Sequence, residues 1–208
     1  MKYIKMLGLA AVAAAALMAF VGAGTASATT LCTATETPCA TANQINAVHD
    51  NIIKATLSGT AVLERTSGEA LASCTVGGME GKITNGGGSS ATVSGDLTAL
   101  TWGAKGAGCN QTVHTVKLGE LEIHHIAGTD NGTVTAKNTE VTVEIFGVSC
   151  TYGSGAALHL GTLTGGKSPV LHINAVVNKT AGGFLCPEDA RWTATYNVTQ
   201  PTPIYVEP

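Results

Sequence analysis

Apolar and polar residues alternate with a period of two over many short segments of this chain. In residues 140–145 every second position is Val or Ile, with Glu or Thr between them, and Leu121 and Ile123 alternate in the same way with Glu and His. Because successive side chains of a β-strand point to opposite faces, such segments predict strands with one buried and one solvent-facing side. The same pattern predicts further strands in residues 53–57, 60–64, 91–102, 112–118, 133–136, 170–176 and 192–198.

Turn-forming residues separate these predicted strands. Gly-rich clusters occur at residues 86–88, 153–155 and 182–183, and the dipeptide Asn131-Gly132 joins two strand-like segments, which is a strong hairpin signal. Only residues 43–54 have apolar positions at a helical spacing. Many short strands with polar outer faces predict an all-β fold, and we expect an antiparallel β-sandwich of the Ig-like or jelly-roll-like type.

The first 28 residues have the pattern of a secretory signal peptide. Lys2 and Lys5 precede a short, Ala-rich apolar stretch, and the small residues Ala26 and Ala28 form an Ala-x-Ala cleavage site. We therefore expect cleavage between Ala28 and Thr29, and a mature protein that is secreted or held in the cell envelope. The expected organisation is a signal peptide (1–28), an N-terminal segment (29–50) and a β-sandwich domain (51–208).

The expected mature chain is mildly acidic. The formal net charge of the full sequence is −3, and it becomes more negative when Lys2 and Lys5 leave with the signal peptide. This charge disfavours nucleic acids and anionic membrane surfaces as partners, because their phosphate groups attract basic proteins. No later segment is apolar over the roughly 20 residues that a spanning helix needs, so we expect no membrane-spanning part after processing. The partners left open are a cell-wall or extracellular glycan, or another protein.

All six cysteines lie in the expected mature chain. An even number of cysteines in an exported protein predicts a disulfide framework. The C-x-x-C spacing that is typical of zinc sites is absent from the sequence. The tripeptide Ser-Cys-Thr occurs at Cys74 and again at Cys150, and the next cysteine follows after nearly the same interval each time. This repetition favours two related β units, although a Gly- and Thr-rich background could produce it by coincidence. The expected disulfides are Cys32–Cys39, Cys74–Cys109 and Cys150–Cys186.

Several of these features together resemble a known group of proteins. The Cys32–Cys39 segment, the Gly-Thr-Leu-Thr-Gly-Gly stretch at 161–166 and the alternating aromatic segment 192–198 after Cys186-Pro187 are similar to exported, cysteine-containing all-β proteins predicted in actinobacterial genomes. The resemblance covers most of the mature chain. It rests on turns, cysteines and strand aromatics, and that group has no assigned activity. The resemblance therefore implies a fold and a compartment but no catalytic residue.

One segment matches a nucleotide-binding motif in form only. Residues 161–168 fit the pattern G-x-x-x-x-G-K-[ST], which binds phosphate because a helix N-terminus follows it. Here Pro169 is followed by the β-branched, strand-like segment 170–177. We therefore expect a turn with a solvated Lys167, and no cofactor.

Acidic residues and a histidine share one face of a predicted strand. Glu120, Glu122 and His124 alternate with apolar residues, and Glu140 and Glu144 do so in a second segment that could lie in the same sheet. Converging carboxylates and an imidazole could bind calcium or zinc, and paired carboxylates could hydrolyse glycosides. Core burial of Leu121 and Ile123 explains the same pattern without chemistry, so we predict no catalytic or metal-binding residue here.

Aromatic side chains are the remaining candidates for binding. Exposed aromatics on a sheet stack on sugars, but aromatics are only 4% of the chain, and a fold of this size needs most of them in its core. The sequence thus predicts an exported, noncatalytic structural or interaction module of the cell envelope or extracellular space. The alternatives are a carbohydrate- or small-ligand-binding module and a secreted hydrolase or metal-binding protein. The aromatic residues in question are Trp102, Tyr152, Trp192, Tyr196 and Tyr205.

Overall fold

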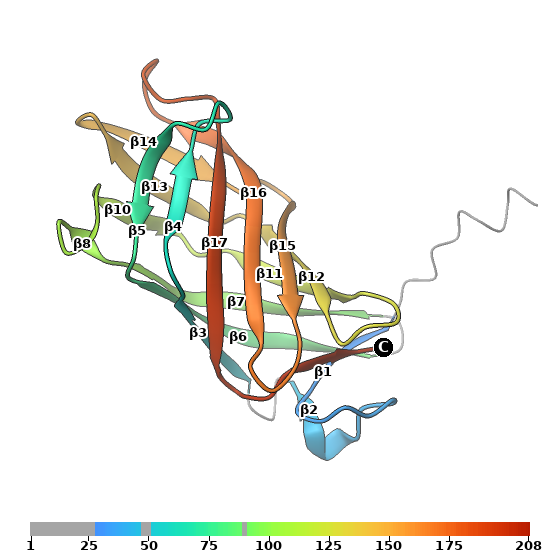
Figure 1. The fold of residues 1–208 in the computed structure, drawn as a ribbon. Helices are drawn as coiled ribbons and strands as arrows, with labels where there is room; N and C mark the ends of the chain where they lie inside the picture. The colour runs from blue at the N-terminus through green and yellow to red at the C-terminus, as the bar shows by residue number, and fades with distance from the viewer. Residues whose placement is uncertain (1–27, 47–50, 89–90) are drawn as a thin grey trace, which may run out of the picture.

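The computed structural model describes residues 28–46, 51–88 and 91–208, and nearly all of its regular structure is β-strand. Residues 1–27 of the predicted signal peptide lie outside the described residues. Eight strands form a closed antiparallel barrel (Figure 1). They are β3 (Ile52–Leu57), β6 (Gly77–Gly88), β7 (Ala91–Trp102), β11 (Glu120–His125), β12 (Gly132–Lys137), β15 (Leu158–Thr164), β16 (Val170–Ala181) and β17 (Asp189–Gln200).

The all-β, antiparallel prediction is confirmed, and the sandwich prediction is wrong. Each barrel strand pairs with the next in the order given, and β17 pairs with β3 to close the ring. A sandwich would leave two separate sheets facing each other. Alternation of apolar and polar residues is the same in both architectures, so the pairing of the first and last barrel strands decides between them.

At one end, here called the upper end, the barrel opens into flanking strands. The upper part of β16 pairs with β14 (Val148–Gly153), and that of β17 pairs with β4 (Ala61–Glu64), as Figure 1 shows. Two groups of strands extend from these contacts. On one side are β13 (Glu140–Ile145) and β10 (Val113–Lys117), and on the other are β5 (Ala70–Cys74), β9 (Gly108–Cys109) and β8 (Ala104–Lys105).

The two ends of the described chain close the opposite, lower end. Strand β1 (Thr29–Cys32) pairs with β2 (Gln44–Ile45), β6 and β18 (Tyr205–Glu207). Gly87 permits the close contact of β1 with β6, because its φ of +79° is left-handed and a Cβ there would lie 1.8 Å from the carbonyl oxygen of Thr29. The apolar side chains of this closing segment are fully buried in the same core cluster as the barrel interior: Leu31, Ile45, Ile204 and Val206.

The segment with helical spacing does not form an α-helix in its described part. Residues Thr41–Asn43 make one 3₁₀ turn, Gln44–Ile45 are strand β2, and strand β3 begins at Ile52. Residues 47–50 of this segment lie outside the described residues. Pairing of Ile45 with Leu31 and of Ile52 with Lys82 places these apolar residues in a sheet. Among the described residues, no helix combines the length and apolar composition needed to cross a membrane.

Three disulfides join the six cysteines, in the sequential pairing that the sequence favours. Cys32–Cys39 lies at the lower end, Cys74–Cys109 joins β5 to β9, and Cys150–Cys186 joins β14 to the loop between β16 and β17. Intramolecular disulfides of this kind are typical of extracellular proteins. The second and third disulfides differ in their structural setting. Cys74 and Cys109 lie opposite each other on paired strands, whereas Cys186 lies in a loop. Both segments nevertheless contribute strands to one barrel.

Candidate functional site

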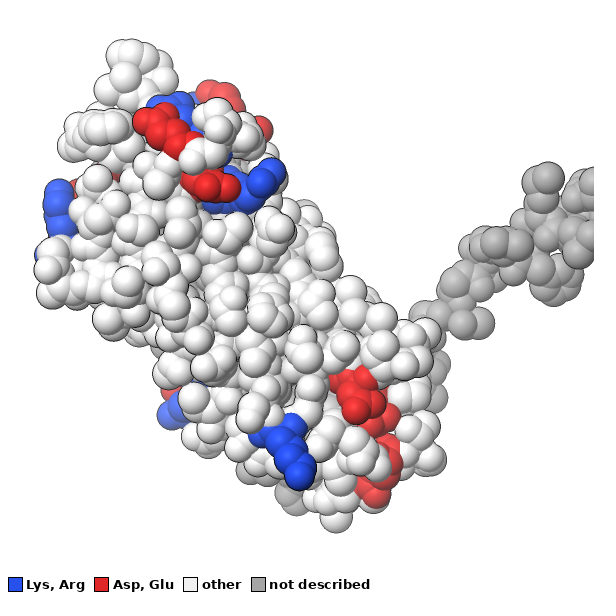
Figure 2. Space-filling model, viewed as in Figure 1, with Lys and Arg blue, Asp and Glu red and all other residues white. Residues whose placement is uncertain are grey.

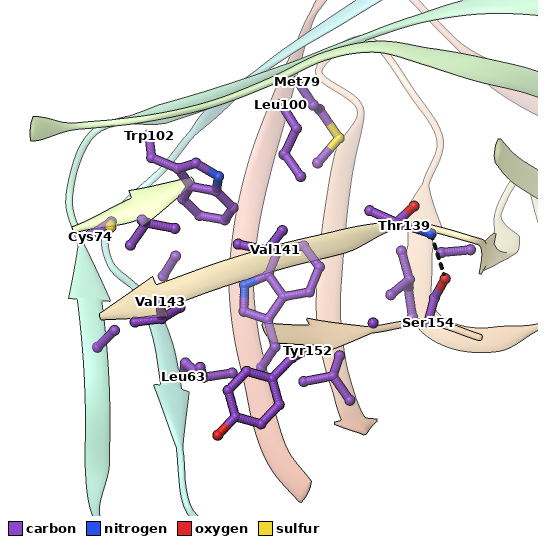
Figure 3. A pocket seen from close by; sticks show the side chains of 18 of the residues that line it. Leu63, Cys74, Met79, Leu100, Trp102, Thr139, Val141, Val143, Tyr152 and Ser154 are labelled. Atoms are coloured by element: carbon purple, nitrogen blue, oxygen red, sulfur yellow. Dashed lines mark hydrogen bonds between the residues drawn. The ribbon is translucent and has the colours of Figure 1, made fainter. Parts of the chain in front are cut away.

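An apolar cavity of about 90 Å³, the upper cavity, lies where the barrel meets the flanking strands. Alternation places the inward residues of facing strands around it, and Figure 3 shows Met79, Leu100, Trp102 and Val141 pointing into the same space. Its wall comes from both groups of flanking strands and from the barrel itself. Besides these four, the main contributors are Ala61, Leu63, Ala72, Leu97, Leu121, Ala136, Val143, Leu158, Leu160, Val177 and Trp192.

Both tryptophans of the chain line this cavity. The ring centroids of Trp102 and Trp192 are 6.2 Å apart, with 58° between the ring planes, a tilted arrangement that is favourable for aromatic pairs. Trp102 donates a 3.1 Å hydrogen bond from Nε1 to Oγ1 of Thr115, which in turn donates to the carbonyl oxygen of Leu100 at 2.7 Å. Because Nε1 of Trp102 is hydrogen-bonded within the protein, a ligand can contact only the carbon atoms of this indole ring.

Thr139 and Tyr152 are two further residues with polar groups in the wall of the upper cavity. The backbone N–H of Thr139 donates to Oγ of Ser154 at 3.0 Å (Figure 3). The Thr139 hydroxyl donates to the carbonyl oxygen of Leu118 at 2.7 Å. The Tyr152 hydroxyl points away from the cavity in Figure 3, and burial raises the pKa of this phenol, with an opposing effect of the Arg65 charge. A ligand in this cavity would meet carbon almost everywhere.

A second apolar cavity of about 80 Å³, the lower cavity, lies deeper in the barrel. Val93, Ile123 and Val134 belong to its wall, and Ile204 from the closing segment forms part of it. The two cavities are neighbours separated by side chains, because they share three lining residues, namely Met79, Leu97 and Leu121. Eight-stranded barrels have interiors that side chains can fill or that can hold one small ligand.

Charged side chains lie outside this apolar interior. Figure 2 shows them gathered towards the two ends of the visible face, with few over its middle. The cavity walls carry no ion pair between described residues. The described ion pairs lie on outward-facing positions of strands or in loops, and they join Lys54 to Glu80, Arg65 to Glu69, Lys137 to Glu122, and Lys179 to Glu188.

The predicted acidic–histidine face lies on the outside of the barrel. Leu121 and Ile123 line the cavities, so Glu120, Glu122 and His124, which alternate with them on β11, face outwards. The Glu122 carboxylate accepts a hydrogen bond from the Lys137 ammonium group, and this contact raises the pKa of Lys137. Glu122 thus has a structural partner on the neighbouring strand β12.

Glu140 and Glu144 do not join this face. They lie on β13, which pairs with β10 and β14 and not with β11. Among the described residues, one group of three possible metal-ligating side chains is close enough to share an ion, namely Cys32, Glu36 and Cys39. The sulfur atoms of its two cysteines are bonded to each other, so neither can serve as a thiolate ligand.

The formal nucleotide motif is strand and turn. Residues 161–164 belong to β15, and β16 begins at Val170, so the segment that follows the motif is a strand, as predicted. Gly161 is required for sheet packing, since a Cβ at this position would lie 1.9 Å from the carbonyl oxygen of His172. No helix N-terminus is present in this described segment to bind a phosphate.

The aromatic residues that the sequence offers for binding are mostly internal. Trp102 and Trp192 line the upper cavity, and Tyr152 and Tyr196 are buried. Tyr196 is fully buried, lines neither cavity, and its hydroxyl has no hydrogen-bond partner among the described residues, so burial raises its pKa. The described large apolar side chains that are most exposed are instead Phe146 and Phe184, at 79% and 94%.

The sequence did not reveal the cavities. Their walls combine residues from many strands between positions 53 and 204, and each residue looks like an ordinary inward-facing strand position. The clearest local signal was the pair of alternating segments that place Trp102 and Trp192 on inner faces. Comparison of the chain with protein-family models, curated proteins and solved structures finds no match.

Proposed function

We propose that this is an exported, noncatalytic protein that binds a small apolar ligand in the upper cavity of its barrel. The observation that carries the proposal is the composition of the cavity wall: apolar side chains around two tryptophans, with the Nε1 atom of Trp102 and the polar atoms of Thr139 hydrogen-bonded within the protein. A cavity lined in this way favours apolar molecules, because a polar ligand would lose more hydrogen bonds with water than the wall could replace. Export and disulfides suit a binding protein that works outside the cytoplasm.

Carbohydrate binding, hydrolysis and metal binding have less support. Carbohydrate binding calls for exposed aromatics on a sheet face, whereas Trp102 and Trp192 line an internal cavity. A hydrolase or metal site calls for converging polar groups, whereas Glu122 is paired with Lys137 on the outer face and is separated from Glu140 by the strand order.

A structural or interaction module of the cell envelope is the second candidate function. It is favoured by Phe146 and Phe184, which are exposed in loops next to the Cys150–Cys186 disulfide. Co-sedimentation of the mature protein with isolated cell envelopes would test it, comparing the wild type with the double variant Phe146→Ser/Phe184→Ser. Equal binding of the two proteins would remove the support that these residues lend.

Ligand binding can be measured with benzene as a compact apolar probe. We expect benzene to raise the melting temperature of the mature protein in a saturable way, because a ligand that binds only the folded state stabilises it. It should also change the tryptophan emission, because both tryptophans of the chain line the cavity.

Two variants separate binding in the cavity from binding at the surface. Ala136→Leu adds three carbons at the cavity wall and should weaken the benzene response at least tenfold. Phe184→Ser removes the most exposed aromatic side chain among the described residues, which does not line the cavity, and should leave the response unchanged. No saturable response of the wild type, or a response lost in Phe184→Ser and kept in Ala136→Leu, would contradict the proposal.

A further inference from the structure

The two cavities are stacked along the barrel axis. On β12, Ala136 lines the upper cavity, and Val134, two positions earlier on the same face, lines the lower one. At ~3.3 Å per residue this step is roughly 7 Å along the strand. The order is the same on β7, where Val93 lines the lower cavity and Trp102 the upper one.

Together the cavities mark a long and narrow path. Val93 and Trp102 stand near opposite ends of β7, which at ~3.3 Å per residue corresponds to roughly 30 Å of strand. Barrel strands tilt by about 35–45° from the axis, so the path along the axis is on the order of 20 Å. Its walls are apolar over this length.

Side chains alone divide the path. The residues common to both cavities are Met79, Leu97 and Leu121, each from a different strand of the barrel. Methionine has an unbranched side chain with three rotatable bonds, and it adapts readily to the shape of its neighbours. Changes of rotamer at these three positions can therefore join the cavities without any change of backbone pairing.

Neither the ring of strands nor the lower end offers access to the path. The strands around the barrel are hydrogen-bonded in a closed ring, so a ligand cannot pass between them without breaking backbone hydrogen bonds. At the lower end, Leu31, Ile45, Ile204 and Val206 are fully buried in the core cluster of the barrel. The upper end is covered by the flanking strands, whose buried residues form a second core cluster that includes Ala72, Val143 and Tyr152 of the cavity wall. These strands lie outside the closed ring, so a ligand would enter at this end by displacing them and not the ring.

From this geometry we infer that the ligand is a single unbranched hydrocarbon chain, which passes through the upper cavity and continues past Met79 into the lower one. The inference rests on the proposed function and specifies its ligand. A polar end group on the chain remains at the upper end, because the lower end is closed and the interior is apolar. A compact ligand would fill the upper cavity only.

A series of straight-chain primary alcohols, from about four to about twelve carbons, tests the shape of the site. Each methylene that moves from water into an apolar cavity improves affinity by about fourfold. We expect this gain to continue beyond the length that fills the upper cavity and to level off once the lower cavity is filled. Binding is measured from the tryptophan emission and confirmed by calorimetry.

A variant that fills the lower cavity provides a second test. Val134→Phe places an aromatic ring there, and we expect it to bring the affinity for the longest alcohols down to that for the short ones. Val176→Phe is the matched control, since Val176 is 40% exposed on β16 and lines neither cavity, and it should keep the full gain with chain length. If Val134→Phe does not fold, the wild-type series alone decides.

The results separate this inference from the proposed function. Benzene binding together with a continued gain over the alcohol series supports both. Benzene binding with no gain beyond the shortest alcohols overturns the chain-shaped ligand and leaves the proposed function in place. Failure of benzene and of every alcohol to bind overturns both.

Discussion

Filling the upper cavity should stabilise the protein, and Ala136→Leu is the substitution that tests this. Ala136 is 1% exposed and its side chain lies at the cavity wall. Three added carbons at ~0.8 kcal/mol each give about 2.4 kcal/mol of transfer free energy. A cavity of about 90 Å³ corresponds to a similar cost of about 2 kcal/mol when it is empty.

The expected gain is smaller than either figure. Ordering a buried leucine side chain costs roughly 0.5–1 kcal/mol of conformational entropy. We therefore expect the free energy of unfolding to rise by about 1–2 kcal/mol, and the melting temperature by about 2–8 °C for a chain of this size. Urea unfolding of oxidised residues 29–208, followed by far-UV circular dichroism, measures the change. An unaltered m-value shows that the wild type and the variant expose the same amount of surface on unfolding.

Ala190→Leu is the matched control for this experiment. Ala190 is fully buried in the second core cluster and lines neither cavity. The same three carbons have no space there, so overpacking should lower the stability by about 1–3 kcal/mol. Equal destabilisation by the two substitutions would refute the argument, because it would mean that the cavity does not accept a side chain of this size.

Three further predictions concern the disulfides, a buried hydroxyl and the outer face. Replacing Cys150 and Cys186 by Ala should lower the free energy of unfolding by about 3–4 kcal/mol through the entropy of the opened loop, measured in urea; a loss below about 1 kcal/mol would contradict it. Tyr196→Phe should stabilise by up to about 1 kcal/mol, since the hydroxyl is buried without a described partner. Because burial raises the pKa of Tyr196, only the unfolded state ionises as the pH rises above its ordinary value of 10.0, so wild-type stability should fall there by up to about 1.4 kcal/mol per pH unit, and the variant should show a smaller fall. Glu122→Gln should lower the stability only slightly, through the loss of its contact with Lys137, and zinc or calcium should leave the melting temperature unchanged; a metal-dependent rise lost in the variant would indicate a metal site.

The local pattern of the sequence determined the class of fold and the covalent framework. Alternation in residues 140–145 and 192–198 predicted strands, and both segments lie in strands, β13 and β17. The repeated Ser-Cys-Thr spacing favoured the pairing that the disulfides of Cys74 and Cys150 have. These features depend on neighbouring residues or on simple intervals along the chain, so the sequence displays them directly.

Gly-rich strands were harder to recognise. Strand β6 contains six glycines between Gly77 and Gly88, both included, and glycine usually indicates a turn. In the structure these glycines allow backbones to approach closely: a Cβ at Gly77 would lie 3.0 Å from the carbonyl oxygen of Thr101, and one at Gly86 would lie 2.6 Å from Cβ of Asn46. The reason for each glycine lies on a neighbouring strand or segment, which the local sequence does not identify.

Closure of the barrel and the position of the cavities were decided by tertiary structure alone. The pairing of β3 with β17 joins residues far apart in the chain, such as Ala55 and Val198, and alternation within each strand is compatible with a sandwich as well. The same holds for the site, where Ala136, Trp102 and Trp192 meet only because closure brings their strands around a common axis. A periodic pattern specifies which face of a strand is buried, whereas long-range pairing specifies which buried faces meet and how much space remains between them.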